Sequence, residues 1–378
     1  MIDIKSMNVP ELEGLLAHWG QPKFRAKQIF SWLHDKRVLT FGEMTNLPAA
    51  LREKLEAECA ITSLEVERKL VSRLDGTVKY LYRLPDGQHV ESVRMQYEHG
   101  ISLCISSQVG CKMGCAFCAS TKAGFVRNLT ASEILEQVYA AGRDAGERIG
   151  SIVMMGIGEP LDNFDNVMRF LELVADPNGL NLSHRHISLS TCGVVDRIRE
   201  LAEKDLQITL SISLHATDDQ ARSAIMPVNR RWQIGELLDA CREYTDRTHR
   251  RISYEYALIS GVNDSRRQAE ELAGLLRRDT VLVTLPMVDS ELGVIQPVQE
   301  VAALLKDYPN CCLHVDATQA VGKIPVTFAN ADTMSLAAHK FYGFNGSGLL
   351  LKREKLAMEP LIHGGASASL YRSGTPPV

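Results

Sequence analysis

The sequence predicts an α/β protein made of an N-terminal helical module, a β-hairpin segment, a partial parallel barrel and a final α/β segment. Apolar residues recur at helical spacing near the N-terminus and then alternate with polar residues. From Ile101 onward they form strand-like runs that alternate with helical runs. We therefore expect segments at residues 1–62, 63–100, 101–278 and 279–378.

The first segment has the pattern of a small helical bundle. Its apolar residues are spaced as on one face of each helix, and they are Leu12, Leu15, Leu16, Trp19, Ile29, Phe30, Leu33, Leu51, Leu55 and Cys59. Basic residues lie between them, namely Lys23, Arg25, Lys27, Arg52 and Lys54. A basic helical surface can bind RNA phosphates, and an ordinary solvated face explains the same charges.

The second segment has the pattern of antiparallel hairpins. Residues 64–66, 78–82 and 90–93 supply short alternating runs. Asp75-Gly76 and Pro85-Asp86-Gly87 separate these runs, and both are turn sequences typical of hairpins.

Repeated βα units predict a parallel sheet in the third segment, curved into a partial barrel. The expected strands are Ile101–Ser106, Ile152–Met155, His186–Ser190, Ile208–Leu214 and Ile252–Leu258. The expected helices are Ala131–Gly142, Asn166–Ala175, Val195–Glu203, Ile234–Tyr244 and Arg266–Leu276. Thr130 and Glu133 form a capping box at the first helix.

Composition favours a soluble cytoplasmic protein with no membrane partner. The N-terminus has no apolar leader segment, and the 378 residues contain no run of 18 apolar ones. Nine cysteines in a chain of this length indicate thiol or metal chemistry in a reducing compartment rather than a disulfide framework. Because the net charge is −4, any nucleic-acid binding must use local basic patches.

Cys111, Cys115 and Cys118 form a C-x3-C-x2-C array. Iron–sulfur clusters take soft thiolate ligands, and three of them leave one iron of a [4Fe–4S] cluster open to a substrate or cosubstrate. The alternatives are a zinc site, which normally uses paired knuckles and a fourth protein ligand, or unpaired cysteines of a reducing compartment. The spacing favours the cluster, and it resembles the array of radical S-adenosylmethionine (SAM) enzymes, which implies SAM on the open iron.

Further polar residues follow successive predicted strands, where barrel active sites lie. Gly158 and Glu159 follow the second strand, Ser190 ends the third, and Ser213, Leu214 and His215 end the fourth. Glycine there lets backbone approach a ligand, and Glu159 can receive the ammonium of SAM. Each position alone has a structural explanation, a turn or a satisfied histidine, so the prediction depends on their shared placement behind the cysteine loop.

Residues 8 to about 277 resemble radical-SAM RNA adenine-C2 methyltransferases of the RlmN/Cfr type. The resemblance is carried by residues 23–28, 41–48, 103–111, 213–216 and 261–264. It implies a radical SAM barrel that modifies 23S rRNA and tRNA and takes electrons from a reductant such as flavodoxin. In its chemistry a protein cysteine is methylated, and the carbon radical formed from that methyl adds to adenine C2.

The same resemblance assigns residues to roles. It implies cluster ligands at Cys111, Cys115 and Cys118, and SAM contacts at Gly158, Glu159, Ser190, Ser213, Leu214 and His215. Glu91 matches the general base, and Cys104 matches the auxiliary cysteine that helps resolve the protein–RNA adduct. Candidate phosphate contacts are Arg222, Arg230, Arg231, Arg250 and Arg251, for each of which solvated surface is the alternative.

The chain departs from this family after Leu276. The family's methyl-carrying cysteine lies in a D-I-D-A-A-C-G segment that has no match here, and Cys311 and Cys312 are the only downstream cysteines. They precede a strand-like run, and such cysteines are commonly small buried hydrophobes. Residues 281–286 can still supply a sixth barrel strand.

Residues from about 279 to 378 instead resemble an internal part of NifS/IscS-type cysteine desulfurases, which are fold-type I pyridoxal-phosphate (PLP) enzymes. The matching stretches are 291–297, 314–323, 339–343 and 372–375. The resemblance implies a Schiff-base lysine at Lys340, a ring-nitrogen carboxylate at Asp316, a ring-oxygen contact at Gln319 and phosphate contacts at His339 and Thr375. Ala337 and Ser290 depart from its phosphate serine and its asparagine.

Three hypotheses follow. The chain is a radical-SAM RNA methyltransferase with a foreign C-terminal segment, a PLP protein related to desulfurases, or a fusion that binds the cluster and SAM without completing methyl transfer.

Overall fold

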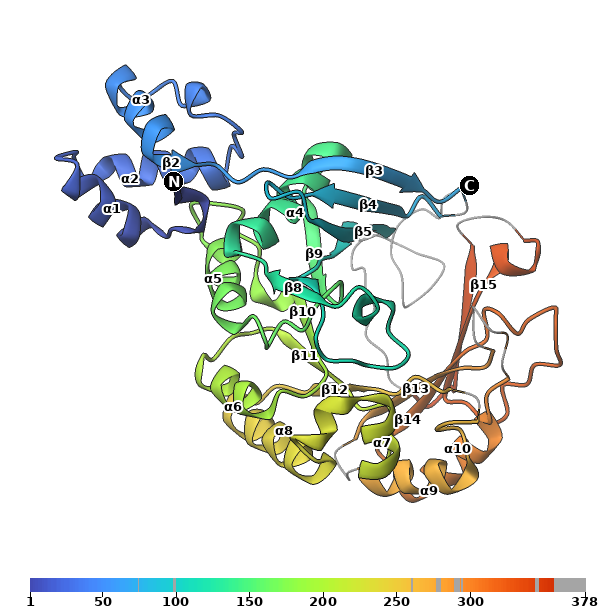
Figure 1. Cartoon of the computed structure of the whole chain (residues 1–378). Helices are drawn as coiled ribbons and strands as arrows, with labels where there is room; N and C mark the ends of the chain where they lie inside the picture. The colour runs from blue at the N-terminus through green and yellow to red at the C-terminus, as the bar shows by residue number, and fades with distance from the viewer. Residues whose placement is uncertain are drawn as a thin grey trace. The chain divides into compact units, whose positions relative to one another are not determined.

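The computed structural model describes residues 1–73, 75–97, 100–259, 261–276, 280–288, 293, 295–343 and 347–356. The chain forms two compact units, Met1–Asn263 and Asp264–Val378 (Figure 1). Each unit has its own apolar core.

The first unit begins with the expected helical module. It contains α1 (Val9–His18), α2 (Phe24–His34) and α3 (Ala49–Glu58), with 3₁₀ turns at Ile4–Ser6 and Phe41–Glu43. A short parallel pair, β1 (Ile2–Asp3) and β2 (Cys59–Ala60), joins its two ends. Most of the apolar positions predicted to face inward are buried, and Leu15 and Trp19 are partly buried.

The hairpin segment is confirmed. Strands β3 (Glu65–Val71), β4 (Val78–Arg83) and β5 (His89–Tyr97) pair antiparallel. Gly76 and Gly87 lie in the two turns with φ of 71° and 82°, which glycine adopts without a Cβ clash.

The parallel strands follow in the expected order. They are β6 (Gly100–Cys104), β9 (Ile149–Met154), β10 (Ile187–Thr191), β11 (Thr209–Ser213) and β12 (Ile252–Glu255). They continue the hairpins in one eight-stranded sheet of order β12-β11-β10-β9-β6-β5-β4-β3. A partial barrel extended by antiparallel strands is therefore the frame of this unit.

Helices α4 (Ala131–Ala145), α5 (Phe164–Ala175), α6 (Val195–Glu203) and α8 (Ile234–Thr248) connect these strands, and Figure 1 shows α5, α6 and α8 along one side of the sheet. The predicted capping box at Thr130 and Glu133 is present. Shorter elements were not predicted: strands β7 (Gln108–Gly110) and β8 (Phe125–Asn128), helix α7 (Asp219–Ile225) and 3₁₀ turns at Ala119–Thr121, His184–His186 and Pro227–Arg230.

The second unit contains α9 (Arg266–Leu275), α10 (Val298–Leu304) and a 3₁₀ turn at Leu305–Asp307 beside a four-stranded sheet. Its strands are β13 (Leu282–Pro286), β14 (Cys312–Asp316), β15 (Thr333–Ala337) and β16 (Gly348–Lys352), and only β16 runs antiparallel. The expectation that residues 281–286 supply a sixth barrel strand is wrong, because β13 pairs with β14. The residue pattern of this segment predicts a strand, but it does not specify which sheet the strand joins.

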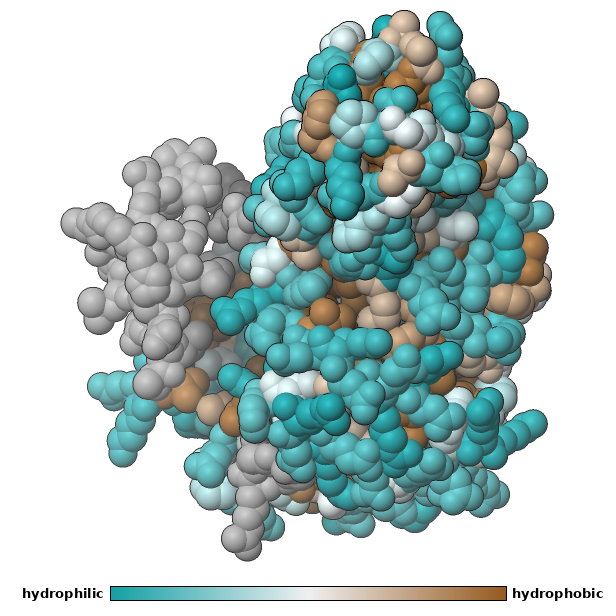
Figure 2. Space-filling view, turned by 90° about the vertical axis from the view of Figure 1, so that its left-hand side faces the viewer, coloured by the Kyte–Doolittle hydropathy of each residue, from teal (hydrophilic) through white to brown (hydrophobic). Residues whose placement is uncertain are grey.

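Within the described ranges, no helix is long and apolar enough to cross a membrane. Figure 2 shows a face that is mostly hydrophilic, where apolar residues gather only in small scattered groups.

Candidate functional site

The three-cysteine loop is closed by an antiparallel pair of short strands, β7 and β8. Gly110, at the end of β7, has φ of 71°, and a Cβ there would lie 1.7 Å from the carbonyl oxygen of Gly124. The amide of Cys111 donates to that same oxygen at 3.2 Å. The backbone is thus so close at the loop's base that only glycine fits at position 110.

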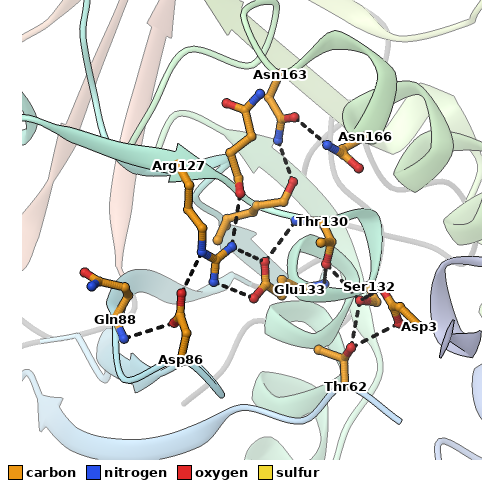
Figure 3. Close-up of polar contacts among 12 residues, drawn as sticks. Asp3, Thr62, Asp86, Gln88, Arg127, Thr130, Ser132, Glu133, Asn163 and Asn166 are labelled. Atoms are coloured by element: carbon orange, nitrogen blue, oxygen red, sulfur yellow. Dashed lines mark hydrogen bonds and ion pairs between the residues drawn. The ribbon is translucent and has the colours of Figure 1, made fainter. Parts of the chain in front are cut away.

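Arg127 holds the returning strand β8 in place. Its Nε donates to Asp86 in the β4–β5 turn at 2.7 Å, and its two terminal nitrogens donate to Glu133 at 2.7 and 2.8 Å (Figure 3). The side chain of Asn163 donates to the carbonyls of Ser107 and Leu129, both at 2.8 Å. Charge-assisted, bidentate contacts of this kind fix geometry well, so the loop's two ends are anchored to the barrel.

The three thiols lie near enough to one another for their charges to interact. Cys111 and Cys115 are each 8% exposed, and Cys118 is half-buried. Burial raises the pKa of Cys111, and burial followed by the charges of Cys111 and Cys118 raises the pKa of Cys115 to about 12. Among the described residues, no three His, Cys, Asp or Glu side chains are already drawn into a metal-binding arrangement.

The donor set nevertheless fits an iron–sulfur cluster. Three soft sulfurs from one short loop are near enough to repel one another as thiolates, and a bound metal would compensate that repulsion and keep them deprotonated. The amide of Ala116 donates to the carbonyl of Ile225 at 2.8 Å, which holds the loop against helix α7.

Gly158 and Glu159 follow β9 and lie beside the loop's stem. Gly158 has φ of 106°, and a Cβ there would lie 2.6 Å from Cβ of Gln108. Glu159 is buried, which raises its pKa, and its oxygens accept from the amides of Leu161 at 3.0 Å and Cys192 at 2.8 Å. The carboxylate expected to bind an ammonium therefore also joins the ends of β9 and β10.

Ser190 and Ser213 lie on one face of the sheet, as the strand-end prediction requires. Ser190 is opposite Ser211 on β11, and Ser213 is opposite Glu255 on β12. Because alternate residues of a strand share a face, all four side chains point to the same side.

His215 adopts a left-handed conformation with φ of 54° directly after this strand. Its Nδ1 accepts from the amide of Ala257 at 3.0 Å, and its ring packs edge-on against Phe117 of the cysteine loop at 4.9 Å. Burial, followed by the charge of Arg222, lowers the pKa of His215 to about 4. A neutral ring with Nδ1 as acceptor keeps its proton on Nε2, which leaves that nitrogen as a donor.

Leu214 is 2% exposed, and its side chain belongs to the interior. Its amide donates to the carbonyl of Glu255 at 3.0 Å, and its carbonyl accepts from Arg222 at 3.0 Å. Any contact with a bound cosubstrate would therefore have to involve its backbone.

Arg222 corrects one expectation. It is fully buried, so it cannot contact RNA phosphates. Its guanidinium donates to the carbonyls of Cys192, Ser213 and Leu214 and to the side chain of Asn229. The sequence shows that Arg222 follows the fourth strand. It does not show that the ends of neighbouring strands come together around the guanidinium and bury it.

Glu91 and Cys104 come together on the sheet. Val93 of β5 is opposite Cys104 of β6, and Glu91 is two residues before Val93, so both side chains share a face. Glu91 forms an ion pair with Lys79 at 2.8 Å and is 39% exposed, whereas burial raises the pKa of the Cys104 thiol. Buried Ser106 donates to the Glu91 carbonyl at 2.6 Å and accepts from the Ile157 amide at 3.0 Å.

In the second unit, Asp316 ends β14 and Lys340 lies in a 3₁₀ turn, Ala338–Phe341, after the neighbouring parallel strand β15. Asp316 accepts from the amide of Thr318 at 2.9 Å, and Gln319 accepts from Lys323 at 2.7 Å. The side chain of His339 and the whole of Thr375 lie outside the described residues.

The described residues supply part of what PLP needs. The lysine and the aspartate, which are the residue types for the Schiff base and the ring nitrogen, follow neighbouring parallel strands. Gln319 accepts from Lys323 through its amide oxygen, which leaves its NH2 group as a donor, whereas Ala337 has no hydroxyl to hold a phosphate.

Comparison with protein families gives three matches, of which two overlap over residues 246–273. Residues 2–61 match the ribosomal RNA large subunit methyltransferase N-terminal domain, and residues 105–273 match the radical SAM superfamily. Residues 246–377 match aminotransferase class V. Both resemblances noted from the sequence are thus confirmed.

Two curated relatives and one solved structure extend the comparison. "Probable dual-specificity RNA methyltransferase RlmN" of Lachnospira eligens is 52% identical over 277 residues, 73% of this chain and 79% of that protein. Its namesake in Lachnoclostridium phytofermentans is 50% identical over 284 residues, 75% of this chain and 80% of that protein. The crystal structure of a radical SAM methyltransferase from Sphaerobacter thermophilus is 39% identical, with a TM-score of 0.73 and coverage of 83% of this chain and 95% of that one.

Proposed function

This chain belongs to the RlmN family of dual-specificity RNA methyltransferases, and on that premise we propose that it methylates C2 of adenine in 23S rRNA and tRNA. The observation that carries the proposal is the cysteine loop anchored beside the strand ends that present Glu159, Ser190 and His215. We propose that it works in the cytoplasm with a reductant such as flavodoxin.

Cys111, Cys115 and Cys118 would hold the [4Fe–4S] cluster, which when bound supplies the electron for cleavage of SAM. The chain's own residues bind and orient the cosubstrate. Neutral His215 offers an Nε2–H donor, and Ser190 and Ser213 offer hydroxyls on one face. Gly158 brings backbone close to the same region.

Glu91 and Cys104 suit the later steps on RNA. Adenine C2 is not nucleophilic, so a carbon radical derived from a sulfur-bound methyl must add there. The adduct then loses one electron, a base removes the C2 proton, and a thiol forms a disulfide with the sulfur that delivered the carbon and so releases the product. Glu91, open to water, is proposed as the base, and the more buried Cys104 as the thiol. Their common face on adjacent strands supports action on one bound base.

The helical module supports RNA binding by charge and stacking. Lys36 lies 3.5 Å from the ring centre of Trp32, Arg25 lies 4.8 Å from that of Phe24, and Lys54 lies 4.9 Å from that of Trp19. Cations beside aromatic rings can contact phosphates and unpaired bases.

The test is incubation of the anaerobically reconstituted chain with SAM, reduced flavodoxin and 23S rRNA lacking the modification. We expect C2-methyladenosine in digested RNA and 5′-deoxyadenosine in solution. The variant Cys115→Ala should lose the iron absorbance and both products while keeping its helical circular dichroism. Unchanged iron content in that variant would remove the cluster assignment, and failure of the wild-type chain to cleave SAM would overturn the function.

A second candidate follows from the cysteines beyond Cys241. Only Cys311 and Cys312 remain there, and burial raises the pKa of both thiols. Neither suits a methyl carrier, so the alternative is a chain that cleaves SAM without methylating RNA. Formation of 5′-deoxyadenosine with no C2-methyladenosine, and no methylated cysteine by mass spectrometry, would favour this alternative.

A further inference from the structure

Glu255, the last residue of β12, has no role in the function proposed above. Its carbonyl accepts from the amides of Leu214 at 3.0 Å and His215 at 3.2 Å. Its side chain is opposite Ser213 in the sheet register, and the Ser213 hydroxyl donates to Oε2 at 3.5 Å. The residue therefore contacts the β11 strand end through both its backbone and its carboxylate.

The surroundings of this carboxylate are hydroxyls rather than cations. Burial raises the pKa of Glu255, and donation from Ser213, Ser190 and Ser211 opposes that rise. Among the described residues, only serine side chains act on the charge of Glu255, and none of the ion pairs includes it. A half-buried carboxylate without a cation depends on hydrogen-bond donors, and its two oxygens, with about four lone-pair sites, can accept more than these three serines donate. This position therefore suits a ligand that brings donors of its own.

The ligand chemistry follows from what a carboxylate accepts. Two oxygens on a planar group match two adjacent hydroxyls, which is how acidic residues bind ribose in nucleotide sites. An ammonium is the other class of donor, and Glu159 already lies on the opposite side of Ser190, bonded to the end of β10. The diol therefore fits Glu255 better.

We propose that Glu255 binds the ribose of the SAM nucleoside by accepting hydrogen bonds from its 2′- and 3′-hydroxyls, beside the hydroxyls of Ser190 and Ser213. This inference rests on the proposed function, because it assumes that SAM is the cosubstrate. It assigns the ribose to β12 and leaves the methionine end to the Gly158–Glu159 loop.

The test measures binding rather than turnover, by calorimetry on the reconstituted full chain. The probes are S-adenosylhomocysteine, its 2′-deoxy derivative and its deamino derivative. Glu255→Gln keeps the side-chain size and the backbone contacts, and we expect it to weaken S-adenosylhomocysteine binding about tenfold or more. The 2′-deoxy derivative should bind the wild-type chain more weakly than S-adenosylhomocysteine does. Glu255→Gln should then reduce the affinity for this derivative much less than it reduces the affinity for S-adenosylhomocysteine.

Glu243→Gln is the matched control, because Glu243 is an exposed glutamate bonded to Arg199 on the surface. It should leave the affinity for every probe unchanged. Should Glu255→Gln unfold the chain, Glu255→Asp keeps the charge, and the same comparison of probes applies to it.

The assignment would be overturned if Glu255→Gln lowered the affinities for S-adenosylhomocysteine and its 2′-deoxy derivative by the same factor. It would also be overturned if the variant bound S-adenosylhomocysteine as tightly as the wild-type chain does. A loss that disappears only with the deamino probe would overturn it in favour of an ammonium contact. If the wild-type chain binds none of the probes and cleaves no SAM, both the proposed function and this inference are wrong.

Discussion

His34 shows how a single buried residue makes the fold sensitive to acid. It is fully buried against Tyr139, and burial, followed by the charge of Lys5, lowers its pKa to about 3 from 6.5. Between these values the unfolded chain binds a proton that the folded chain excludes, so stability falls as the pH falls below about 6.5.

We expect His34→Gln to flatten this pH dependence. Because the unfolded chain protonates His34 and the folded chain does not, the wild-type chain should lose roughly 3 kcal/mol of unfolding free energy between pH 6.5 and pH 4. Urea unfolding at several pH values measures the slope, and His18→Gln, an exposed change on α1, is the control. Equal slopes for wild type and His34→Gln would show that other groups cause the acid sensitivity.

Gly158 tests the close approach of backbone beside the proposed SAM site. Alanine there must adopt φ of 106° with its Cβ 2.6 Å from that of Gln108. We expect Gly158→Ala to cost about 1–3 kcal/mol of stability and to weaken S-adenosylhomocysteine binding. Gly235→Ala is the control, because a Cβ meets nothing within 4 Å at that helical position. Unchanged binding and stability in Gly158→Ala would mean that the loop rearranges freely.

At this scale the sequence predicts residue type and strand position, but not pairing across strands. Ser190 and Ser213 could be found because hydroxyls end predicted strands. Glu255 lies within a predicted strand, but only the observed register, which places it opposite Ser213, shows that its carboxylate belongs to the candidate site. Arg222 was misassigned, because local sequence does not show that strand ends will bury it.

At the scale of elements, the buried ion pair of Lys5 and Glu136 fastens the N-terminal segment to helix α4. Both side chains are fully buried, and their charged atoms lie 2.7 Å apart. Lys5 also donates to the carbonyl of Thr62, and Glu136 also binds Arg143. Removing one partner leaves a buried charge without compensation, which is far more costly than losing an exposed pair.

We expect Glu136→Leu to lower stability by about 3–5 kcal/mol and to expose the N-terminal module to proteolysis. Adding Lys5→Met should recover part of that loss, so a double-mutant cycle should give a coupling well above 1 kcal/mol. The exposed Lys54–Glu58 pair, 3.8 Å apart, is the control and should give about 0.5 kcal/mol or less. A coupling near zero for Lys5 and Glu136 would mean that apolar packing alone holds the module.

Elements with strong periodicity were predictable, and short ones were not. The helix at Val195–Glu203 was predicted with its observed bounds, since apolar spacing and flanking strands agree. Helix α7 and the β7–β8 pair are too short for periodicity to show. Tertiary contacts hold them, from Arg222 on α7 and from Arg127 on β8. Strand β13 was assigned to the wrong sheet, because alternation does not specify a partner.

At the scale of the whole molecule, the described residues form two separate apolar cores. One gathers residues from Ile4 to Tyr244, and the other gathers residues from Leu276 to Leu351. The three tryptophans, Trp19, Trp32 and Trp232, all lie in the first unit. Their fluorescence therefore reports on that unit, whereas circular dichroism reports on both.

We expect this division to make the two probes respond differently to core substitutions. Leu313→Ala removes a buried side chain of the second core and should cost about 2–5 kcal/mol there. It should shift part of the circular dichroism transition while leaving the tryptophan transition in place. Leu189→Ala removes a fully buried side chain of the first core and should shift the tryptophan transition instead. Coincident transitions that move together in both variants would mean that the two cores unfold as one cooperative unit.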